Sequence, residues 1–328
     1  MKILAIYGPT VTGKTNLAIK LAQKYNGELI SADSRQVYKG LDIGTGKVNF
    51  ESKTEKHQDY WIVDGVKVHG FDLLKPGKNF SAADFVKFAS NLVRDIKKQG
   101  KFPIIVGGTG FYIKSYLYGF DTLGIPADLK LRKRLEKLSA SHLYQKLLKI
   151  NSRRAHRMND SDRQNPRRLI RVIEILSSKS TIQSASPAKR SEPSNYPSTQ
   201  NYLLIGLTAP NEYLYERADK WFKKRFNQGL IIEVDTLIRH GVSAHWLENL
   251  GLEYRWITRY VQGKISVEQT KKRLKGDIHE FIRRQKTFFN QFADIQLFDI
   301  SKENWLKELE KTVSTWYNQQ DGRIYSSS

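Results

Sequence analysis

Eight residues near the N-terminus have the types and spacing of a phosphate-binding loop. They follow the apolar run 3–7 and precede a segment, 16–22, whose apolar residues recur at helical spacing. In the pattern G-x-x-x-x-G-K-[ST], backbone N–H groups and the lysine bind phosphate, and the last hydroxyl ligates Mg²⁺. The pattern predicts a polyphosphate site in which Thr15 faces the metal. Its residues are Gly8, Pro9, Thr10, Val11, Thr12, Gly13, Lys14 and Thr15.

Two further polar residues stand where strands are expected to end. Asp33 closes the segment 29–33, and a carboxylate there can act as a general base or ligate Mg²⁺. A helix N-cap is the alternative reading of Asp33. Thr109 lies in the turn Gly107–Gly110, which either presents a hydroxyl to a phosphate or is a tight strand–helix connection.

The elements that must position these residues alternate between strand and helix over the first 120 residues. A helix is predicted from 82 to 99, because Ser81 is a good N-cap and Asp84 follows at the third helical position. The alternation predicts an α/β fold with a P-loop NTPase-like parallel sheet, whose strand ends bring the polar residues to one edge. The predicted strands are 3–7, 29–33, 102–106 and 202–207, with weaker segments at 61–63 and 66–68.

The rest of the chain is predicted to be mostly helical. Residues 121–201 form a basic helical insertion, with helices over 129–148 and 165–176 and a Ser- and Pro-rich loop over 177–200. We therefore divide the chain into a catalytic core of residues 1–120 and 202–318, the insertion, and a frayed tail of residues 319–328. From residue 211 onward every signal is helical, which predicts a helical C-terminal part.

The net charge of +22 is typical of a protein that binds nucleic acid. The charge is concentrated: residues 121–200 hold 17 Lys and Arg against 7 Asp and Glu, and residues 255–286 hold 10 against 3. Two such blocks favour a partner surface over a generally basic composition, which is the alternative.

Composition excludes several other classes of protein. The chain has no cysteine, which excludes disulfides and thiolate metal sites. Its apolar runs fall short of the ~18 residues that a membrane span needs. A core strand begins almost at the N-terminus, so we expect no signal peptide. We also expect a cytoplasmic location and a monomer without membrane contact.

A longer set of motifs gives the chain a specific resemblance. The segment 30–47 contains Asp33-Ser34, Gln36-Val37-Tyr38-Lys39-Gly40 and Asp42-Ile43-Gly44-Thr45. Later matches include Phe71-Asp72, Val106-Gly107-Gly108-Thr109-Gly110, Arg168-Leu169-Ile170-Arg171, Gly229-Leu230 and Arg284-Gln285. From residue 3 to about 292, the sequence resembles the tRNA dimethylallyltransferases.

This resemblance implies a reaction, a cofactor and site residues. Such enzymes transfer a dimethylallyl group from dimethylallyl diphosphate to the exocyclic amine of the adenine 3′ of the anticodon, in tRNAs that read codons starting with U. It implies that the loop of residues 8–15 holds the diphosphate leaving group rather than ATP. It also implies Mg²⁺ and the catalytic residues Asp33, Thr109 and Lys14. It also implies a tRNA-binding set of Asp33, Ser34, Arg35, Gln36, Thr109, Arg132, Arg167, Arg168, Leu169, Ile170, Arg171, Arg255, Arg283, Arg284 and Gln285.

The chain departs from the family's pattern at three places, one of which is the pair His69-Gly70. Trp221 stands where family members often carry an arginine associated with the diphosphate, and Arg225 or Lys224 is one turn further on. Glu253 stands in place of the glycine of a Gly-Tyr pair. The rival functions are a small-molecule kinase, a transferase that acts on free adenine nucleotides, and a non-enzymatic RNA-binding protein.

Overall fold

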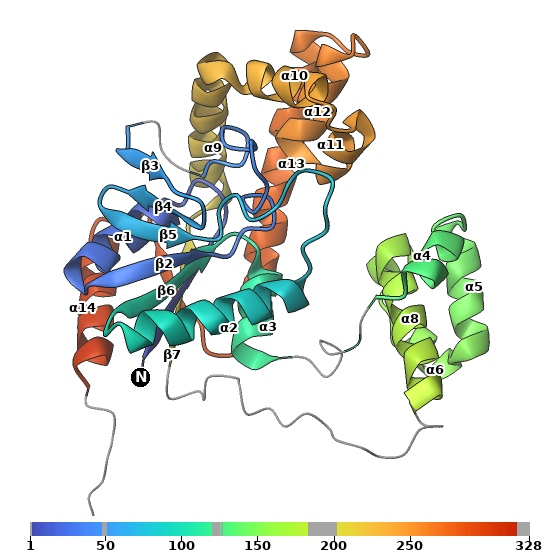
Figure 1. The fold of residues 1–328 in the computed structure, drawn as a ribbon, viewed down its shortest axis with the longest axis horizontal. Helices are drawn as coiled ribbons and strands as arrows, with labels where there is room; N and C mark the ends of the chain where they lie inside the picture. The colour runs from blue at the N-terminus through green and yellow to red at the C-terminus, as the bar shows by residue number, and fades with distance from the viewer. Residues whose placement is uncertain (1, 48–50, 120–124, 126, 183–201, 320–328) are drawn as a thin grey trace, which may run out of the picture. The chain divides into compact units, whose positions relative to one another are not determined.

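The larger part of the protein is built on one eight-stranded sheet (Figure 1). The computed structural model describes residues 2–47, 51–119, 125, 127–182 and 202–319, with the side chains of 179–182 left out. The sheet has the order β3-β4-β5-β2-β6-β1-β7-β8. Its strands are β1 Ile3–Tyr7, β2 Gly27–Ser31, β3 Thr54–Lys56, β4 Tyr60–Val63, β5 Val66–His69, β6 Phe102–Gly107, β7 Tyr202–Thr208 and β8 Gln296–Asp299.

The predicted parallel sheet is confirmed from β5 to β8, and it carries an antiparallel edge. The weak strand segments at 61–63 and 66–68 form a hairpin, β4–β5, to which β3 adds. Asp64 and Gly65 have φ of 49° and 80°, as expected for the Asp-Gly turn that suits the twist of a hairpin.

β8 contradicts the prediction that every element after residue 211 is helical. It pairs in parallel with β7 at the other edge of the sheet. The strand has only four residues, of which the first two are exposed. A segment this short carries too few alternating residues to be recognised from the sequence, so its pairing with β7 defines it.

Helices cover both faces of the sheet, as the alternation of side chains along β1 requires. Leu4 and Ile6 belong to one apolar core with α1 and α14, whereas Ala5 and Tyr7 belong to a second core with α2 and α3. The predicted helix after Ser81 is confirmed as α2, with a complete capping box between Ser81 and Asp84. These helices are α1 Lys14–Lys24, α2 Ala82–Lys98, α3 Gly110–Tyr118 and α14 Trp305–Asn318.

The helical C-terminal part is also confirmed. A π-helical turn, η2 (Phe226–Leu230), joins α9 to α10, and its Gly229 has φ of 100°. A 3₁₀ turn, η3 (Phe288–Gln291), follows α13. Within the part of the chain that the structure describes, no helix has the length and apolar content of a membrane span. The helices are α9 Asn211–Arg225, α10 Ile231–Arg239, α11 Ala244–Leu250, α12 Leu252–Val261 and α13 Val267–Thr287.

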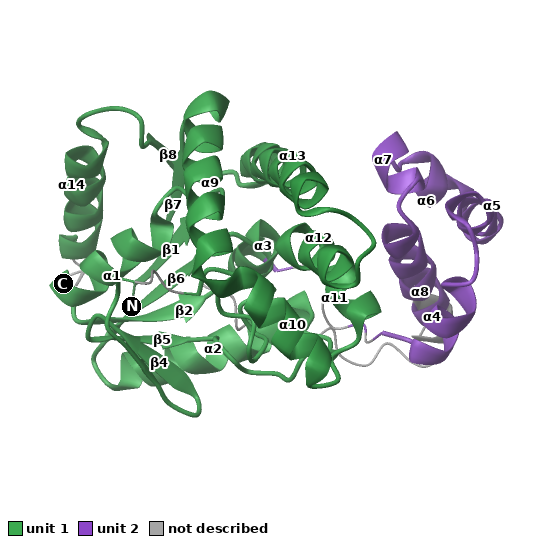
Figure 2. Ribbon diagram, turned by 90° about the horizontal axis from the view of Figure 1, so that it is seen from above, with its two compact units in different colours: residues 1–118, 196–328 green, residues 119–195 purple. Residues whose placement is uncertain are grey.

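The chain forms two compact units, residues 1–118 with 196–328 and residues 119–195 (Figure 2). The smaller unit has its own core, to which Leu143, Leu147 and Ile173 contribute. The single helix predicted over 129–148 is wrong: α4 ends at Leu135, and Ser139 caps a new helix by accepting from the His142 N–H. Its helices are α4 Leu129–Leu135, α5 Ala140–Ile150, α6 Ser152–His156, α7 Asp160–Arg163 and α8 Pro166–Ile182.

Most of the predicted loop 177–200 and of the predicted tail 319–328 lies outside the residues that the structure describes. Residues 177–182 of the predicted loop are the end of α8, and residues 183–201 lie outside the described residues. The same holds for residues 320–328 of the predicted tail.

A buried carboxylate links β2 to β5 and to the residue that precedes β6. Glu28 of β2 is 3 % exposed, lies 2.7 Å from His69 Nε2 of β5 and accepts from Lys101 Nζ at 2.5 Å. Burial raises the pKa of Glu28, but the contacts with His69 and Lys101 outweigh it and lower the pKa from 4.5 to about 2. The interaction therefore stabilises the fold above pH 4.5 and is lost as the pH falls toward 2.

We expect Glu28→Gln to lower the free energy of unfolding at pH 7 by about 1–3 kcal/mol, because a charged hydrogen-bond acceptor is removed from a buried site. The loss of stability between pH 4.5 and 2 should also become shallower. Urea unfolding followed by circular dichroism at several pH values measures both effects. Glu303→Gln, at an exposed position, is the control, and an equal effect of the two variants would contradict the assignment.

Candidate active site

The phosphate loop joins the end of β1 to the start of α1. Gly13 is the N-cap of α1, and a glycine offers no side chain to bond the first N–H groups of the helix. Those N–H groups can therefore face an anion. Lys14 Nζ donates to the Pro9 carbonyl at 3.2 Å, which folds the lysine back over the loop. Thr15 lines the same cavity as Lys14.

Lys14 is positioned where its charge is costly to maintain without an anion. Burial lowers the pKa of its ammonium to about 8, and the Asp33 carboxylate opposes that shift. A bound anion would favour the protonated form in the same way. Binding of an anion by the loop therefore offsets the free-energy cost of burying the charged Lys14 ammonium.

Asp33 and Thr109 lie together just past the ends of β2 and β6. The Asp33 Oδ1 accepts from the Arg35 N–H at 2.9 Å, a local turn that fixes the carboxylate. Thr109 Oγ1 accepts from the Ser34 N–H at 3.0 Å, and the Thr109 N–H donates to the Ala32 carbonyl at 3.1 Å. Thr109 thus ties the two strand ends together and holds the turn that carries Asp33.

Gly108 marks the point on which three polar groups converge. A Cβ built on Gly108 would lie 2.7 Å from Gln285 Nε2, 3.7 Å from Asp33 Oδ2 and 3.7 Å from Lys14 Nζ. Any other residue would push the Gln285 amide away. The predicted base and the loop lysine are therefore brought together, and α13 contributes a third group to the same place.

These groups open into a cavity of about 430 Å³. Among the described residues that line it, Asp33 is the one acid, against the cations Lys14, Arg35, Lys47, Arg217, Lys220 and Arg225. The apolar part of the lining includes Ile19, Val68, Phe71, Val106 and Phe281. A cavity that combines cationic and apolar walls suits a ligand with an anionic end and an apolar end.

Trp221 and Arg225 form a stacked pair at this cavity. The Arg225 guanidinium lies 4.4 Å from the centroid of the Trp221 ring and donates to the Ile43 carbonyl. Burial lowers the pKa of Arg225 to about 10, so the side chain stays charged at neutral pH. Lys224 is instead exposed and pairs with Glu51 at 2.6 Å. Of the two alternatives to an arginine at position 221, only Arg225 faces the cavity.

Glu253 also has a partner within the site. Its carboxylate accepts from Arg35 Nη1 at 2.7 Å, and the two side chains are 3 % and 15 % exposed. Burial lowers the pKa of Arg35, but the Glu253 and Asp33 carboxylates outweigh it and raise the pKa. The departure at Glu253 therefore creates an ion pair next to the segment that carries Asp33.

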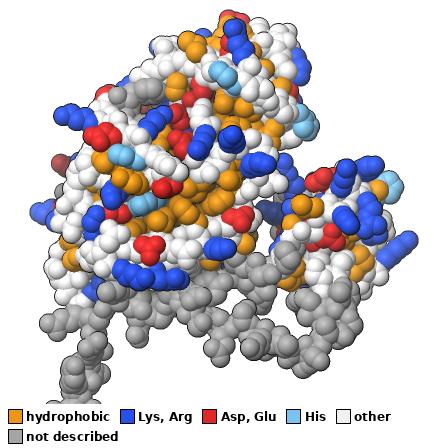
Figure 3. All heavy atoms as spheres, viewed as in Figure 1, with side chains coloured by type: hydrophobic (Ala, Val, Ile, Leu, Met, Phe, Trp, Pro, Cys, Tyr) orange, Lys and Arg blue, Asp and Glu red, His pale blue; other side chains and the backbone are white. Residues whose placement is uncertain are grey.

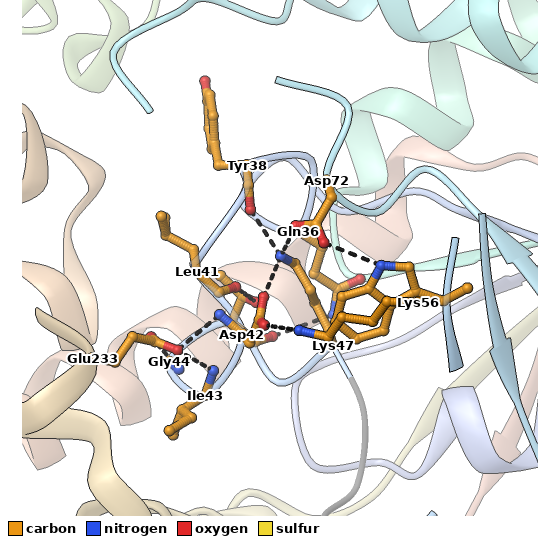
Figure 4. A network of polar contacts seen from close by, with 12 residues as sticks. Gln36, Tyr38, Leu41, Asp42, Ile43, Gly44, Lys47, Lys56, Asp72 and Glu233 are labelled. Atoms are coloured by element: carbon orange, nitrogen blue, oxygen red, sulfur yellow. Dashed lines mark hydrogen bonds and ion pairs between the residues drawn. The ribbon is translucent and has the colours of Figure 1, made fainter. Parts of the chain in front are cut away.

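The segment 36–47 is held by a polar network that the sequence reasoning missed (Figure 4). Glu233 of α10 accepts from the N–H groups of Asp42, Ile43 and Gly44, at 2.8, 2.6 and 3.1 Å. Lys47 is fully buried, and its ammonium lies between the carboxylates of Asp42 and Asp72. A glycine-rich segment that carries acidic and basic residues is often found at the protein surface. The network is therefore recognised only from the structure, in which Lys47 is buried.

Away from the site around Asp33 and Gly108, the structure separates the residues that were predicted to bind tRNA into three groups. Leu169 and Ile170 are buried in the core of the smaller unit, so we assign their side chains to packing. Arg132 and Arg171 both donate to Glu174, with Arg132 bidentate at 2.5 and 2.9 Å.

The remaining basic residues are more accessible. Arg167 is exposed on α8, and Arg168, also exposed, pairs with Asp162. In the larger unit Arg283 and Arg284 are exposed, and Arg255 pairs with Asp277 at 3.4 Å. Figure 3 shows Lys and Arg side chains gathered over the visible face of the smaller unit.

Known proteins resemble this chain along nearly its whole length. Residues 36–292 match the IPP transferase family. The chain is 35 % identical over 330 residues to the tRNA dimethylallyltransferase of Anoxybacillus flavithermus, covering 100 % of this chain and 98 % of that protein. A crystal structure of a tRNA isopentenylpyrophosphate transferase from Bacillus halodurans matches with a TM-score of 0.67 and 31 % identity, covering 96 % of both chains. This protein belongs to the IPP transferase family, which confirms the resemblance inferred from the motifs.

A more distant crystal structure shares the fold. It is a eukaryotic dimethylallyltransferase acting on tRNA, with a TM-score of 0.74 at 23 % identity, and the match covers 97 % of this chain and 79 % of that one. The relatives at 35 % and 34 % identity that are named tRNA dimethylallyltransferases do not favour the kinase or the free-nucleotide transferase as the function.

Because burial lowers the pKa of Lys14 to about 8, we expect its contribution to anion binding to depend on pH. At pH 7, Lys14→Met should weaken the binding of inorganic diphosphate about 10- to 100-fold, since a charge-assisted contact is lost. Above pH 8 the ratio of the two affinities should shrink, because the wild type must then take up a proton to bind. Calorimetry from pH 7 to 9.5 measures the ratio, and a constant value would contradict the assignment.

Proposed function

We propose that this protein is a prenyl transferase that modifies tRNA. It transfers the dimethylallyl group of dimethylallyl diphosphate to the exocyclic amine of the adenine 3′-adjacent to the anticodon, in tRNAs that read codons starting with U, and releases diphosphate. The observation that carries the proposal is the approach of Lys14 and Asp33 to Gly108, next to a phosphate loop. The full-length relatives that are named tRNA dimethylallyltransferases support this pair of substrates.

The chemistry requires a base at the amine. The lone pair of an aromatic exocyclic amine is delocalised into the ring, which makes the nitrogen a weak nucleophile. As the nitrogen–carbon bond forms and the carbon–oxygen bond to diphosphate breaks, the Asp33 carboxylate accepts the proton of the amine. Asp33 Oδ1 is bonded to the Arg35 N–H, and Oδ2 faces the Gly108 turn, where the amine can approach.

The departing diphosphate is stabilised by fixed positive charge. The N–H groups at the start of α1 and the Lys14 ammonium receive it, and Arg217, Lys220 and Arg225 line the same cavity. These groups are in place before the reaction, so their reorganisation costs little as charge develops on the leaving group. The apolar lining near Phe71 and Val106 suits the five-carbon group.

The residues of the loop fit Mg²⁺ bound together with a diphosphate. Thr15 would hold the ion through its hydroxyl, since Mg²⁺ usually takes few protein oxygens and completes its shell with phosphate oxygens and water. No group of three or more His, Cys, Asp or Glu suited to a metal occurs among the described residues. When bound, the ion neutralises charge on the leaving diphosphate.

The adenine must leave its stack to reach this site, at a cost of a few kcal/mol. Contacts with the RNA backbone must offset that cost. The exposed basic residues of both units, such as Arg167 of α8 and Arg283 and Arg284 of α13, are suited to phosphate contacts.

The purified protein, incubated with dimethylallyl diphosphate, Mg²⁺ and an anticodon stem-loop, should add five carbons to the adenine 3′ of the anticodon. Mass spectrometry of the nucleosides measures the product, and a parallel reaction with AMP should give none. Asp33→Asn should lower turnover about 10²- to 10⁴-fold, because the proton acceptor is lost. Binding of the stem-loop should survive in this variant. A product on AMP alone would overturn the proposal, and unchanged turnover of Asp33→Asn would remove its role as the base.

Binding of the stem-loop should weaken steeply as the salt concentration rises, because each phosphate contact releases counterions. Arg167→Ala should make the plot of log affinity against log salt shallower by about 0.7–0.9 per lost contact. Fluorescence anisotropy between 50 and 300 mM salt, on the order of cellular ionic strength, measures the slope. Lys307→Ala, an exposed change on α14, should leave it unaltered, and a flat salt dependence of the wild type would exclude the basic surface as the RNA site.

A further inference from the structure

Gln285 of α13 uses both ends of its amide at the phosphate loop. Its Oε1 accepts from the Thr10 N–H at 2.9 Å, and its Nε2 donates to the Gly108 carbonyl at 2.9 Å. The side chain is 5 % exposed, and the main-chain carbonyl of Gln285 accepts from the Tyr7 hydroxyl at 2.7 Å. The amide is therefore fixed between the loop and the turn after β6.

The position of this amide bears on how many phosphates the loop can hold. In loops of this kind the N–H groups surround two phosphates, and the lysine reaches outward toward a third. Here the Thr10 N–H is already bonded to Gln285 and is withdrawn from the cradle. The Gln285 amide and the Lys14 ammonium both lie close to Gly108, so the amide borders the space into which Lys14 reaches.

The charge of Asp33 disfavours a third phosphate, as does the position of the Gln285 amide. The Asp33 Oδ2 reaches the same point near Gly108, so a phosphate placed beyond Lys14 would meet a carboxylate. Two like charges close to each other in a buried site repel strongly. A neutral carbon and an amine meet no such penalty there.

We infer that Gln285, together with Asp33, closes the third phosphate position of this loop, so that the protein accepts a diphosphate and rejects a triphosphate. Gln285 is thus a specificity-determining residue rather than a contact for RNA. The inference rests on the proposed function. It explains how a phosphate loop of the type found in nucleotide-binding proteins can select a diphosphate ester.

Inorganic diphosphate and tripolyphosphate, each with Mg²⁺, test the inference by calorimetry. Charge alone would favour tripolyphosphate in a cationic cavity, so a preference of the wild type for diphosphate of about tenfold or more is diagnostic. Gln285→Ala should narrow that preference about tenfold, by strengthening the binding of tripolyphosphate. Gln291→Ala is the matched control, since Gln291 is an exposed glutamine just past the same helix and pairs with Lys114.

Asp33→Asn provides a second route if Gln285→Ala does not fold, because it removes the repulsion without changing the shape of the site. It should also strengthen the binding of tripolyphosphate relative to diphosphate. Equal affinity of the wild type for both anions would overturn the inference, and so would an equal loss of both affinities in Gln285→Ala, which marks a purely structural role. The prenylation assay is independent: an active enzyme without the preference refutes this inference alone, and an inactive protein with the preference refutes only the proposed function.

Discussion

The parallel register of β2, β6 and β1 is the constraint on which the site depends. Ser31 pairs with Val106, and Tyr7 pairs with Gly107, so three neighbouring strands end at the same level of the sheet. The residues that follow them are the Asp33 turn, the Gly108 turn and the phosphate loop. A parallel sheet must place these connections side by side, because its strands all point the same way.

Close packing at this edge is possible because the turn after β6 is rich in glycine. Gly108 leaves room for the Gln285 amide, and Gly110 leaves room for Phe288, whose ring would lie 2.3 Å from an added Cβ. The end of α13 can therefore lie against the loop and the turn together. A long basic helix that carries Arg283 and Arg284 outward is in this way fixed to the centre that holds Lys14 and Asp33.

A network of hydrogen bonds and ion pairs holds the irregular backbone of segment 36–47 in place beside the cavity. Glu233 satisfies three consecutive N–H groups, and the buried Lys47 joins Asp42 to Asp72. A buried charge is tolerated only when it is paired and hydrogen-bonded, as Lys47 is. This arrangement presents the Ile43 carbonyl to Arg225, and so connects the network to the cationic wall of the cavity.

The sequence by itself determined the elements whose signals are local. The phosphate loop, the capping box at Ser81 and the strong apolar strands each follow from neighbouring residues, and the family follows from motifs read along the chain. The split of 129–148 into α4 and α5 also has a local cause, the Ser139 cap, although the helical periodicity on both sides of it conceals the break. In contrast, β8 is too short for its own pattern to define it, and β7 supplies its hydrogen bonds.

Only the tertiary structure decided which charged and polar side chains are available for chemistry. Nothing in the sequence around Gln285, Arg132 or Arg35 indicates which group each side chain contacts. The fold bonds Gln285 to Thr10 and Gly108, pairs Arg132 with Glu174, and pairs Arg35 with Glu253. The partners lie between 42 and 275 residues away along the chain, so no local pattern encodes them. The chemistry of a polar side chain depends on the groups that it meets in space, whereas helices and strands depend mainly on neighbours in sequence.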